Sequence, residues 1–583
     1  MSKRLVIVGG VAAGASAAAK ARRTKEDLEI VLVEAGPFVS FANCGLPYYV
    51  GGEIADRNDL FVVTADLFRT RFRIDVRLET VVTAVDRRQR RVTLVRPDGD
   101  TRELSYDRLV LATGTTGIVP PIAGIERPNV FTLRTVPDVD AILRHLGQVH
   151  PGAGDRSAEA PSEQRRPRAL VIGGGYIGLE AAEQLRRRDL AVTLVERMPQ
   201  LMTALDAEMA LPVKAALEQL GCEVILNDAI AEVREDGTRP VAVTKSGRQV
   251  PFDLGILAVG VRPNVQLAEA AGIALGATGA IRVDALQRTS DPAIYAAGDN
   301  CETIHRVLGR PVSIPLAGPA NKAGRVAGAN AALDLAGAAE DDPRRLEMPG
   351  VLGTAIVRVG ALAAGVTGLT EAQAKREDIP HAVLYMPGRS HAGYYPGAKP
   401  LLLKLLYDPA DGRVLGAQAV GAEGVDKRID VLATAIQAGM TVRDLEGLDL
   451  CYAPPFGSAK DVEVLAGFAA ANACRGIMPT ITPGELLDKL AAGEPLCVLD
   501  VRMTKEWDAG HLAEAVHVPL DELRDRLADV PADRPVAVHC AGGYRSYLAQ
   551  QVLLAAGRSD VSNVVGGYTM IERVRAARGG PAR

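Results

Sequence analysis

A strand, a glycine-rich turn, an alanine-rich helix and a second strand follow one another twice in this chain of 583 residues. The first copy spans 4–34, where RLVIVGG leads through AAGASAAAKARR to EIVLVEA. The second spans 168–196, where RALVIGGG leads through YIGLEAAEQLRRR to AVTLVE. Each pattern predicts a βαβ unit with two parallel strands in one sheet. A chain of this length with two such units is expected to be α/β and to divide into three or four domains.

The second glycine turn carries the full dinucleotide-binding pattern. Backbone N–H groups at such a turn, together with the helix dipole, bind a pyrophosphate. The strand after the turn ends in Glu196, which would accept a hydrogen bond from a ribose 2′-hydroxyl and repel a 2′-phosphate. This favours NADH, while Arg197 beside the glutamate leaves NADPH use open. We assign to this site Gly173, Gly175, Tyr176, Ile177, Gly178, Glu196, Arg197 and Gly260.

The first glycine turn departs from the pattern, because Val11 replaces the middle glycine. Two other features still indicate a dinucleotide site rather than an ordinary tight turn. Glu34 ends the next strand, 25 residues after Gly9, and the sequence YAAGD follows at 295–299. A carboxylate at the end of the second strand is placed to hold a ribose hydroxyl.

The seven cysteines include two in settings that favour reactive sulfur. No CxxC pair or histidine-rich spacing occurs, so we expect neither a disulfide framework nor a metal site. Cys44 lies in SFANCGLPYYVGG, and Cys540 begins the loop CAGGYR. We interpret the other five, Cys222, Cys301, Cys451, Cys474 and Cys497, as small buried apolar residues.

The CAGGYR loop lies between a predicted strand and a predicted helix. Such a loop can direct successive backbone N–H groups at one sulfur and stabilise an anionic persulfide, with help from the helix N-terminus. The loop residues are Cys540, Ala541, Gly542, Gly543, Tyr544 and Arg545. We expect Arg545 to close the cradle by donating to the loop carbonyls.

Charge and hydropathy exclude some classes of partner. The net charge is −4 without long runs of one sign, which gives no reason to expect nucleic acid or an anionic membrane. No apolar stretch of about 20 residues is present, and the chain enters a predicted strand at once, so we expect a cytoplasmic protein. The segment 148–167 is rich in Pro, Gly and Ser and predicts a surface insertion.

The order of these features resembles the pyridine nucleotide-disulfide oxidoreductase family over residues 1 to about 470. The resemblance implies FAD in the first unit, NAD(P)H in the second, and a homodimer formed through an α+β domain. The implied domains are 1–118 with 290–335 for FAD, 119–289 for NAD(P)H, 336–470 for dimerisation, a linker at 471–482, and 483–583 at the C-terminus. The implied FAD contacts are Gly9, Gly10, Val11, Ala12, Ala13, Gly14, Glu34, Ala112, Thr113, Gly114 and Asp299.

Within that family, the surroundings of Cys44 are similar to those of coenzyme A disulfide reductases. No second cysteine follows Cys44 locally, so it would form a mixed disulfide with an external thiol or pass through an oxidised sulfur state. The resemblance rests on SFANCGLPYYVGG, on the Val-Ala-Ala turn and on YAPPFGSAKD at 452–461. It implies coenzyme A contacts at Arg23, Ser40, Asn43, Asn321 and Lys460. It also implies partner-subunit tyrosines near the cysteine, namely Tyr452 and either Tyr394 or Tyr395.

The C-terminal domain resembles a single-domain rhodanese. LDVR at 499–502, the WxxGH pattern at 507–511 and VPL at 518–520 precede the sulfur loop in matching order. We interpret Asp500 and Arg502 as structural and Trp507 as a core residue. The resemblance implies sulfur transfer at Cys540 with Arg545 beside it.

Together the two resemblances imply an NAD(P)H-dependent reductase of coenzyme A persulfide or polysulfide, coupled to sulfur transfer at Cys540. Three alternatives stay open. The chain could be a coenzyme A disulfide reductase that maintains the thiol pool. It could be an NADH oxidase or peroxidase, against which the absence of a histidine from the first glycine turn argues. Its C-terminal domain could be a sulfur-binding sensor without turnover.

Overall fold

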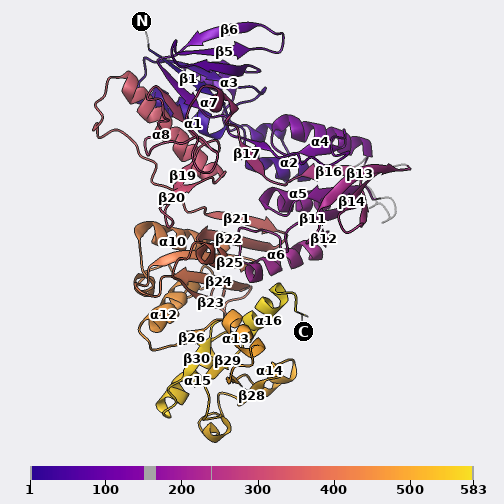
Figure 1. Ribbon diagram of the computed structural model, residues 1–583, viewed down its shortest axis with the longest axis vertical. Coiled ribbons are helices and arrows are strands. Elements are labelled where there is room, and N and C mark those ends of the chain that lie inside the picture. Colours follow the sequence, from indigo (N-terminus) through magenta and orange to yellow (C-terminus); the bar gives the residue numbers. More distant parts are fainter. Residues whose placement is uncertain (1–2, 150–165, 238, 581–583) are drawn as a thin grey trace. The chain divides into compact units, whose positions relative to one another are not determined.

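The computed structural model describes residues 3–149, 166–237 and 239–580 and confirms the expected α/β class (Figure 1). Most of the predicted insertion at 148–167 lies outside the described residues. The chain forms two compact units, Met1–Pro199 with Leu220–Gly353, and Gln200–Gln219 with Thr354–Arg583. Each unit contains two five-stranded sheets, and the first unit contains smaller sheets as well.

The first unit begins with the predicted βαβ element. Its parallel sheet has the order β18-β7-β1-β2-β3, so segments distant in sequence complete one sheet. The strands are β1 (Arg4–Val8), β2 (Glu29–Val33), β3 (Asp75–Arg77), β7 (Arg108–Leu111) and β18 (Ile294–Ala296). The same unit also contains the antiparallel strands β4 (Val81–Asp86), β5 (Arg91–Val95) and β6 (Thr101–Ser105), the pair β19 (Thr303–His305) and β20 (Arg310–Val312), and the helices α2 (Leu46–Gly51), α3 (Ala65–Thr70) and α7 (Gln266–Ala270).

Close packing explains why the first helix is alanine-rich. Helix α1 (Ala12–Thr24) lies against α8 (Ala317–Leu335), and glycines of α8 meet backbone of α1. A Cβ at Gly324 would lie 2.1 Å from the carbonyl oxygen of Ala13, and one at Gly328 would lie 2.2 Å from that of Ala17. Larger side chains at this contact would push the two helices apart.

The second sheet of this unit repeats the architecture with the order β12-β11-β10-β16-β9. Its strands are β9 (Val130–Thr132), β10 (Arg168–Ile172), β11 (Ala191–Val195), β12 (Glu223–Ile225) and β16 (Leu254–Leu257), with helices α4 (Val136–Val149) and α5 (Tyr176–Arg187). The antiparallel strands β13 (Ile230–Asp236), β14 (Arg239–Thr244) and β15 (Gln249–Pro251) form a separate sheet, and β8 (Thr115–Gly117) pairs with β17 (Val261–Pro263). Among the described residues, no helix combines the length and apolar character needed to cross a membrane.

The second unit contains an antiparallel sheet and a parallel one. The antiparallel order is β21-β22-β25-β24-β23, which agrees with the α+β fold implied for this part of the chain. The elements are β21 (Ala355–Val359), β22 (Leu362–Gly368), β23 (Ala382–Arg389), β24 (Pro400–Tyr407), β25 (Val414–Gly421), α6 (Ala207–Gln219), α9 (Glu371–Arg376), α10 (Val425–Ala438), α11 (Val442–Glu446) and α12 (Val462–Cys474).

The C-terminal sheet has the parallel order β26-β30-β29-β27-β28 and includes, as β29, the strand predicted before the CAGGYR loop. Its elements are β26 (Thr480–Ile481), β27 (Cys497–Asp500), β28 (Ala515–His517), β29 (Val536–His539), β30 (Val561–Val564), α13 (Pro483–Ala491), α14 (Thr504–Asp508), α15 (Tyr544–Ala555) and α16 (Gly567–Ala577). Helix α16 packs against α6.

A buried lysine holds α6 and α9 on the antiparallel sheet. Lys404 of β24 is 1% exposed, and its Nζ lies 2.8 Å from Asp206, 2.6 Å from Glu208 and 2.7 Å from Glu371. The Tyr385 hydroxyl donates to the same Glu208 oxygen at 2.8 Å. Although burial opposes ionisation, the ammonium keeps the pKa of Asp206 and Glu371 below the usual range. The carboxylates therefore remain charged inside the protein.

Candidate functional site

The first glycine turn requires glycine for steric reasons. Gly9 has a φ of +97°, and a Cβ there would lie 2.2 Å from the carbonyl oxygen of Ala112. A Cβ at Gly14 would lie 1.7 Å from the carbonyl oxygen of Gly9. Glu34 accepts the Gly10 N–H at 2.6 Å, and burial raises the pKa of its carboxyl group. The predicted glutamate thus lies directly beside the turn.

The second turn has the same geometry with one informative difference. Gly173 has a φ of +108°, and a Cβ there would lie 2.3 Å from the carbonyl oxygen of Ala258. Glu196 accepts the N–H of Gly174 at 2.6 Å. A Cβ at Gly175, however, would meet no protein atom within 4 Å. Packing within the protein does not explain this glycine, and close approach of a phosphate to the backbone stays the prediction for it.

Two further predicted dinucleotide contacts follow strands of the two parallel sheets, Gly114 after β7 and Gly260 after β16. Gly114 and Gly260 both have positive φ, and the Thr113 hydroxyl donates to the carbonyl oxygen of Asn264 at 2.7 Å. Burial raises the pKa of Tyr176, at the start of α5, to about 12. Arg197 is exposed beside Glu196. Val11, Ala12, Ala13 and Ile177 lie at the beginnings of α1 and α5. These positions fit the two dinucleotides.

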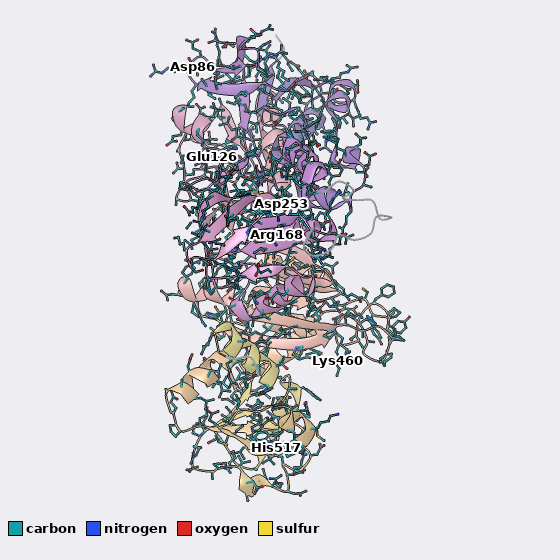
Figure 2. All side chains as sticks on the ribbon, turned by 90° about the vertical axis from the view of Figure 1, so that its right-hand side faces the viewer. Asp86, Glu126, Arg168, Asp253, Lys460 and His517 are labelled. Atoms are coloured by element: carbon teal, nitrogen blue, oxygen red, sulfur yellow. The ribbon has the colours of Figure 1, made fainter. Side chains whose placement is uncertain are left out.

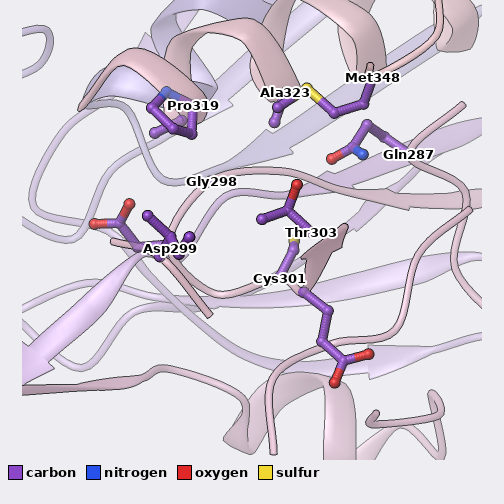
Figure 3. Close-up of a pocket in the computed structure, with 11 residues that line it drawn as sticks. Gln287, Gly298, Asp299, Cys301, Thr303, Pro319, Ala323 and Met348 are labelled. Carbon is purple, nitrogen blue, oxygen red and sulfur yellow. The ribbon is translucent and has the colours of Figure 1, made fainter. Parts of the chain in front are cut away.

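Asp299 follows β18 and lines a small pocket beside α8. Figure 3 shows Gly298, Asp299 and Cys301 together with Pro319 and Ala323 of α8 around this pocket. Burial raises the pKa of the Asp299 carboxyl group, and Arg134, whose Nη2 lies 3.4 Å from it, opposes the shift.

Cys44 is exposed in a short 3₁₀ turn just before α2. Burial of one side of the thiol raises its pKa, and the carboxylate of Glu180 adds to this, while Arg134 acts in the opposite direction. Glu180 also accepts a hydrogen bond from the Tyr48 hydroxyl at 3.0 Å. Within this chain, burial and the nearby charges together favour the thiol over the thiolate. The low pKa expected from a neighbouring oxidised flavin stays a prediction.

Several predicted coenzyme A contacts lie on the outer faces of α1 and α8. Asn321 accepts a hydrogen bond from Ser16 at 2.6 Å, and Arg23 is exposed on α1. Desolvation and the nearby cations Arg325 and Arg23 lower the pKa of Lys20. This positive potential suits phosphate groups. Elsewhere in the unit, Ser40 has a φ of +48° and donates its N–H to the Gly10 carbonyl, and the Asn43 amide donates to the Arg134 carbonyl at 3.1 Å.

The predicted tyrosines and Lys460 lie in the second unit. The hydroxyl groups of Tyr394 and Tyr452 are 2.7 Å apart, and this hydrogen bond raises the pKa of Tyr394. Tyr395 is also exposed, and its ring makes an edge contact with His391. Lys460 is exposed, as Figure 2 shows. The structure thus brings Tyr394 and Tyr452 together.

The Cys540 loop connects β29 to α15, as the sequence predicted. The sulfur is buried and accepts the Gly543 N–H at 3.1 Å and the Ser546 hydroxyl at 3.4 Å. The loop carbonyls of Cys540 and Ala541 accept N–H groups from Tyr568 and Thr569 at the start of α16. A sulfur carried on Cys540 would therefore lie at the N-terminus of a twelve-residue helix.

The contacts of Arg545 contradict the prediction that its side chain donates to the loop carbonyls. In the described contacts its guanidinium does not hold the loop carbonyls but binds both carboxylate oxygens of Glu506 at 2.7 Å. The backbone N–H groups of α16 already satisfy the two carbonyls, and the Arg545 guanidinium interacts instead with Glu506 of α14 and, to a smaller extent, with the Cys540 side chain. Sequence reasoning missed Glu506, because its role depends on a contact 39 residues away.

The residues interpreted as structural lie in the same domain as this loop. Arg502 and Asp500 form a buried pair with Nη2 and Oδ2 2.6 Å apart, which confirms their structural role. Trp507 is half-buried rather than a core residue, and it stacks on His511 and His517 with ring centroids 3.7 and 4.6 Å apart. His517, labelled in Figure 2, also contacts the Arg502 carbonyl at 2.9 Å.

Comparison with known proteins assigns the fold to a family. Residues 3–324 match the pyridine nucleotide-disulphide oxidoreductase family, 354–462 match its dimerisation domain, and 482–573 match the rhodanese-like domain. The chain belongs to the pyridine nucleotide-disulphide oxidoreductase family and carries a C-terminal rhodanese-like domain. Membership in this family implies FAD and NAD(P)H as cofactors.

Individual relatives and solved structures match most or nearly all of this chain. An NADH oxidase of Methanocaldococcus jannaschii is 35% identical over 454 residues, or 78% of this chain and 95% of that protein. The CoA-dependent NAD(P)H sulfur oxidoreductase of Pyrococcus furiosus is 37% identical over 461 residues, or 79% and 97%. Two solved structures align along almost the whole chain. Reduced Bacillus anthracis CoADR-RHD has a TM-score of 0.91 at 40% identity, covering 99% of both chains. The NAD-dependent persulfide reductase from A. fulgidus has a TM-score of 0.85 at 39% identity, covering 97% and 99%.

Proposed function

We propose that this chain is an FAD-dependent NAD(P)H reductase of coenzyme A persulfide or related persulfides, with sulfur transfer at Cys540. The observation that carries the proposal is the presence of two differently built sulfur sites in one chain. Cys44 is exposed, whereas Cys540 is buried in a loop that holds its sulfur by hydrogen bonds. Likeness along the whole chain to a persulfide reductase supports the same conclusion.

At Cys44, the thiolate would attack the inner sulfur of the coenzyme A persulfide. The S–S bond breaks, hydrosulfide leaves, and a disulfide joins Cys44 to coenzyme A. Bound FAD supplies two electrons, derived from NAD(P)H, that reopen this disulfide and release coenzyme A. The tyrosine pair of the partner subunit would protonate the leaving thiolate. Arg134 would offset the effect of Glu180 on the Cys44 thiolate.

At Cys540, a bound persulfide would transfer its outer sulfur to coenzyme A. The Cys540–S bond breaks as the new S–S bond forms on coenzyme A, and Cys540 leaves as a thiolate. The Gly543 N–H and the Ser546 hydroxyl stabilise that negative charge. The product is the substrate of Cys44, so the two sites would act in sequence.

Binding of coenzyme A and the dimer belong to the same proposal. The cations on α1 and α8 support phosphate binding, and Glu196 supports a preference for NADH over NADPH. The exposed side chains of Tyr394, Tyr395, Tyr452 and Phe456 support an interface with a second copy of the chain. We also infer a cytoplasmic location, because the proposed chemistry needs reduced thiols.

The test is anaerobic NADH oxidation with simultaneous measurement of sulfide, using coenzyme A persulfide and coenzyme A disulfide at matched concentrations. We expect about one sulfide per NADH on the persulfide and faster turnover than on the disulfide. Turnover mainly on the disulfide without sulfide would instead identify a disulfide reductase that maintains the thiol pool. In a parallel assay in air without a sulfur substrate, rapid NADH oxidation would identify an oxidase, the activity for which one relative is named.

A further inference from the structure

A carboxylate neutralises the arginine that ends the sulfur loop. Glu506 of α14 binds Nη1 and Nη2 of Arg545 at 2.7 Å and also accepts the Met503 N–H at 3.0 Å. The hydrogen bonds from Arg545 lower the pKa of Glu506 to about 2. The carboxylate is therefore ionised at any pH suitable for an assay, and it occupies the face of Arg545 that could otherwise bind an anionic donor.

The neighbouring ionisable groups are also balanced or neutral. Arg502 is paired with Asp500 inside the domain, 4% and 0% exposed respectively. His539, which precedes Cys540, is buried, and burial lowers its pKa to about 4, so the ring is neutral near pH 7. Neither group adds positive charge to the loop.

Exposed apolar side chains lie near Glu506 and on the helix that follows the sulfur loop. Met503, Tyr544 and Leu548 are exposed, and Tyr544 and Leu548 lie four residues apart on one face of α15. On the loop itself, a Cβ at Gly542 would lie 2.8 Å from Cγ of Pro387 in β23. A donor would therefore reach Cys540 past apolar groups and a neutral ion pair.

These surroundings distinguish two classes of sulfur donor. Thiosulfate carries two negative charges and would lose water without gaining an unpaired cation. An organic persulfide carries at most one charge and brings apolar carbon that the exposed side chains can contact. The electrostatic difference is largest where solvent is excluded, as it is around the buried Cys540 sulfur.

We propose that Glu506 determines which sulfur donors load Cys540, disfavouring dianionic thiosulfate and leaving organic persulfides as the donors. This inference rests on the proposed role of Cys540 as a carrier of sulfane sulfur. In the loading step, the Cys540 thiolate attacks the outer sulfur of R–S–SH. The donor S–S bond breaks, the Cys540–S bond forms, and R–S⁻ takes the proton of the transferred sulfur. No electrons are gained or lost overall.

The test measures sulfur transfer to cyanide by the full-length holoenzyme, with thiosulfate or glutathione persulfide as donor and with the rate of a Cys540→Ser variant subtracted. We expect wild-type kcat/KM to be at least about tenfold higher for the persulfide. Glu506→Gln retains an oxygen that can accept the Met503 N–H but frees Arg545. It should raise kcat/KM for thiosulfate about tenfold, mainly through KM, and change the persulfide value less than about threefold.

A matched control and the salt dependence distinguish donor selection from a structural role. Glu522→Gln removes another carboxylate of this domain, which pairs with Arg526 at 2.7 Å. This variant should leave kcat/KM unchanged for both donors. The gain in Glu506→Gln should shrink as KCl rises, because salt screens the freed Arg545. Equal losses for both donors in this variant would overturn the proposal, since Glu506 would then only hold the loop in place.

Wild-type enzyme alone also tests the inference if Glu506→Gln fails to fold. Its kcat/KM for thiosulfate should stay level or rise as KCl increases, because Arg545, the cation of the sulfur loop, is paired with Glu506. A steep fall in this kcat/KM with KCl, or a higher kcat/KM for thiosulfate than for the persulfide, would overturn the inference. The proposed sulfur transfer at Cys540 would not be affected by that result. Absence of any Cys540-dependent transfer from either donor would instead refute the proposed sulfurtransferase function, and the inference with it.

Discussion

Replacing Lys404 with methionine is expected to destabilise the antiparallel sheet strongly. Methionine matches the lysine stem but leaves Asp206, Glu208 and Glu371 without the ammonium that now lies 2.6 to 2.8 Å from each. Loss of one partner from a buried ion pair costs about 3–5 kcal/mol, because the remaining charges stay desolvated. That range corresponds to an increase of about two to almost four powers of ten in the population of the opened state.

Hydrogen exchange measured by mass spectrometry gives this quantity locally. Peptides from β23 and β24 should exchange faster by that factor in Lys404→Met at pH 7, relative to wild type. The exposed Lys399, which immediately precedes the same strand, supplies the control, and Lys399→Met should change stability by less than about 0.5 kcal/mol.

The pH dependence provides a sharper test of the cause. In wild type the folded pKa values of Asp206 and Glu371 are depressed, so their contribution is present above about pH 4.5 and is lost as the pH falls through the folded values. Without Lys404 the carboxylates bind protons more readily when folded, so the penalty should shrink toward pH 5. Adding Glu371→Gln to Lys404→Met should recover part of the loss. If Lys404→Met lowered the free energy of opening by less than about 1 kcal/mol at pH 7, the reasoning would be refuted.

Three further predictions concern the sites. Cys44→Ser should abolish NADH-dependent persulfide reduction and spare transfer to cyanide, whereas Cys540→Ser should do the reverse; parallel loss of both activities would refute separate sites. Gly175→Ala should raise KM for NADH at least about tenfold and leave the melting temperature of the apoprotein within about 2 °C, since its Cβ meets no protein atom; a large drop in melting temperature would show a packing role. Because the folded pKa of His539 is about 4, the unfolded chain binds the extra proton, and the C-terminal domain should lose up to about 3 kcal/mol between pH 6.5 and 4. Fluorescence of the single tryptophan measures this loss, and an unchanged slope in His539→Asn would contradict it.

The sequence predicted the parts of the fold that depend on local pattern. Both glycine turns, the strand that ends in Glu196 and the loop beginning at Cys540 follow from the order of residue types along a few tens of residues. The exposed position of Cys44 agrees with the reactive role that its surrounding sequence predicts. Such features are determined by backbone conformation and strand burial, which short patterns express directly.

Contacts between distant segments could not be predicted in this way. The approach of Glu180 to Cys44 and the pairing of Arg545 with Glu506 depend on how separate elements pack. Lys404 shows the limit most clearly. Within PLLLKLLYD it interrupts an apolar strand, and only the positions of α6 and α9 reveal why a charge is retained there.

The division of the chain also determines how it can be shortened. Residues 200–219 belong to the second compact unit, although the residues on either side belong to the first. A C-terminal fragment starting at Thr354 would contain Lys404 but not Asp206 or Glu208, so a buried cation would keep one of its three carboxylates. Failure of such a fragment to express would therefore say little about the autonomy of its domains. The fragment should therefore be produced together with a separate peptide covering 200–219, which restores the missing helix.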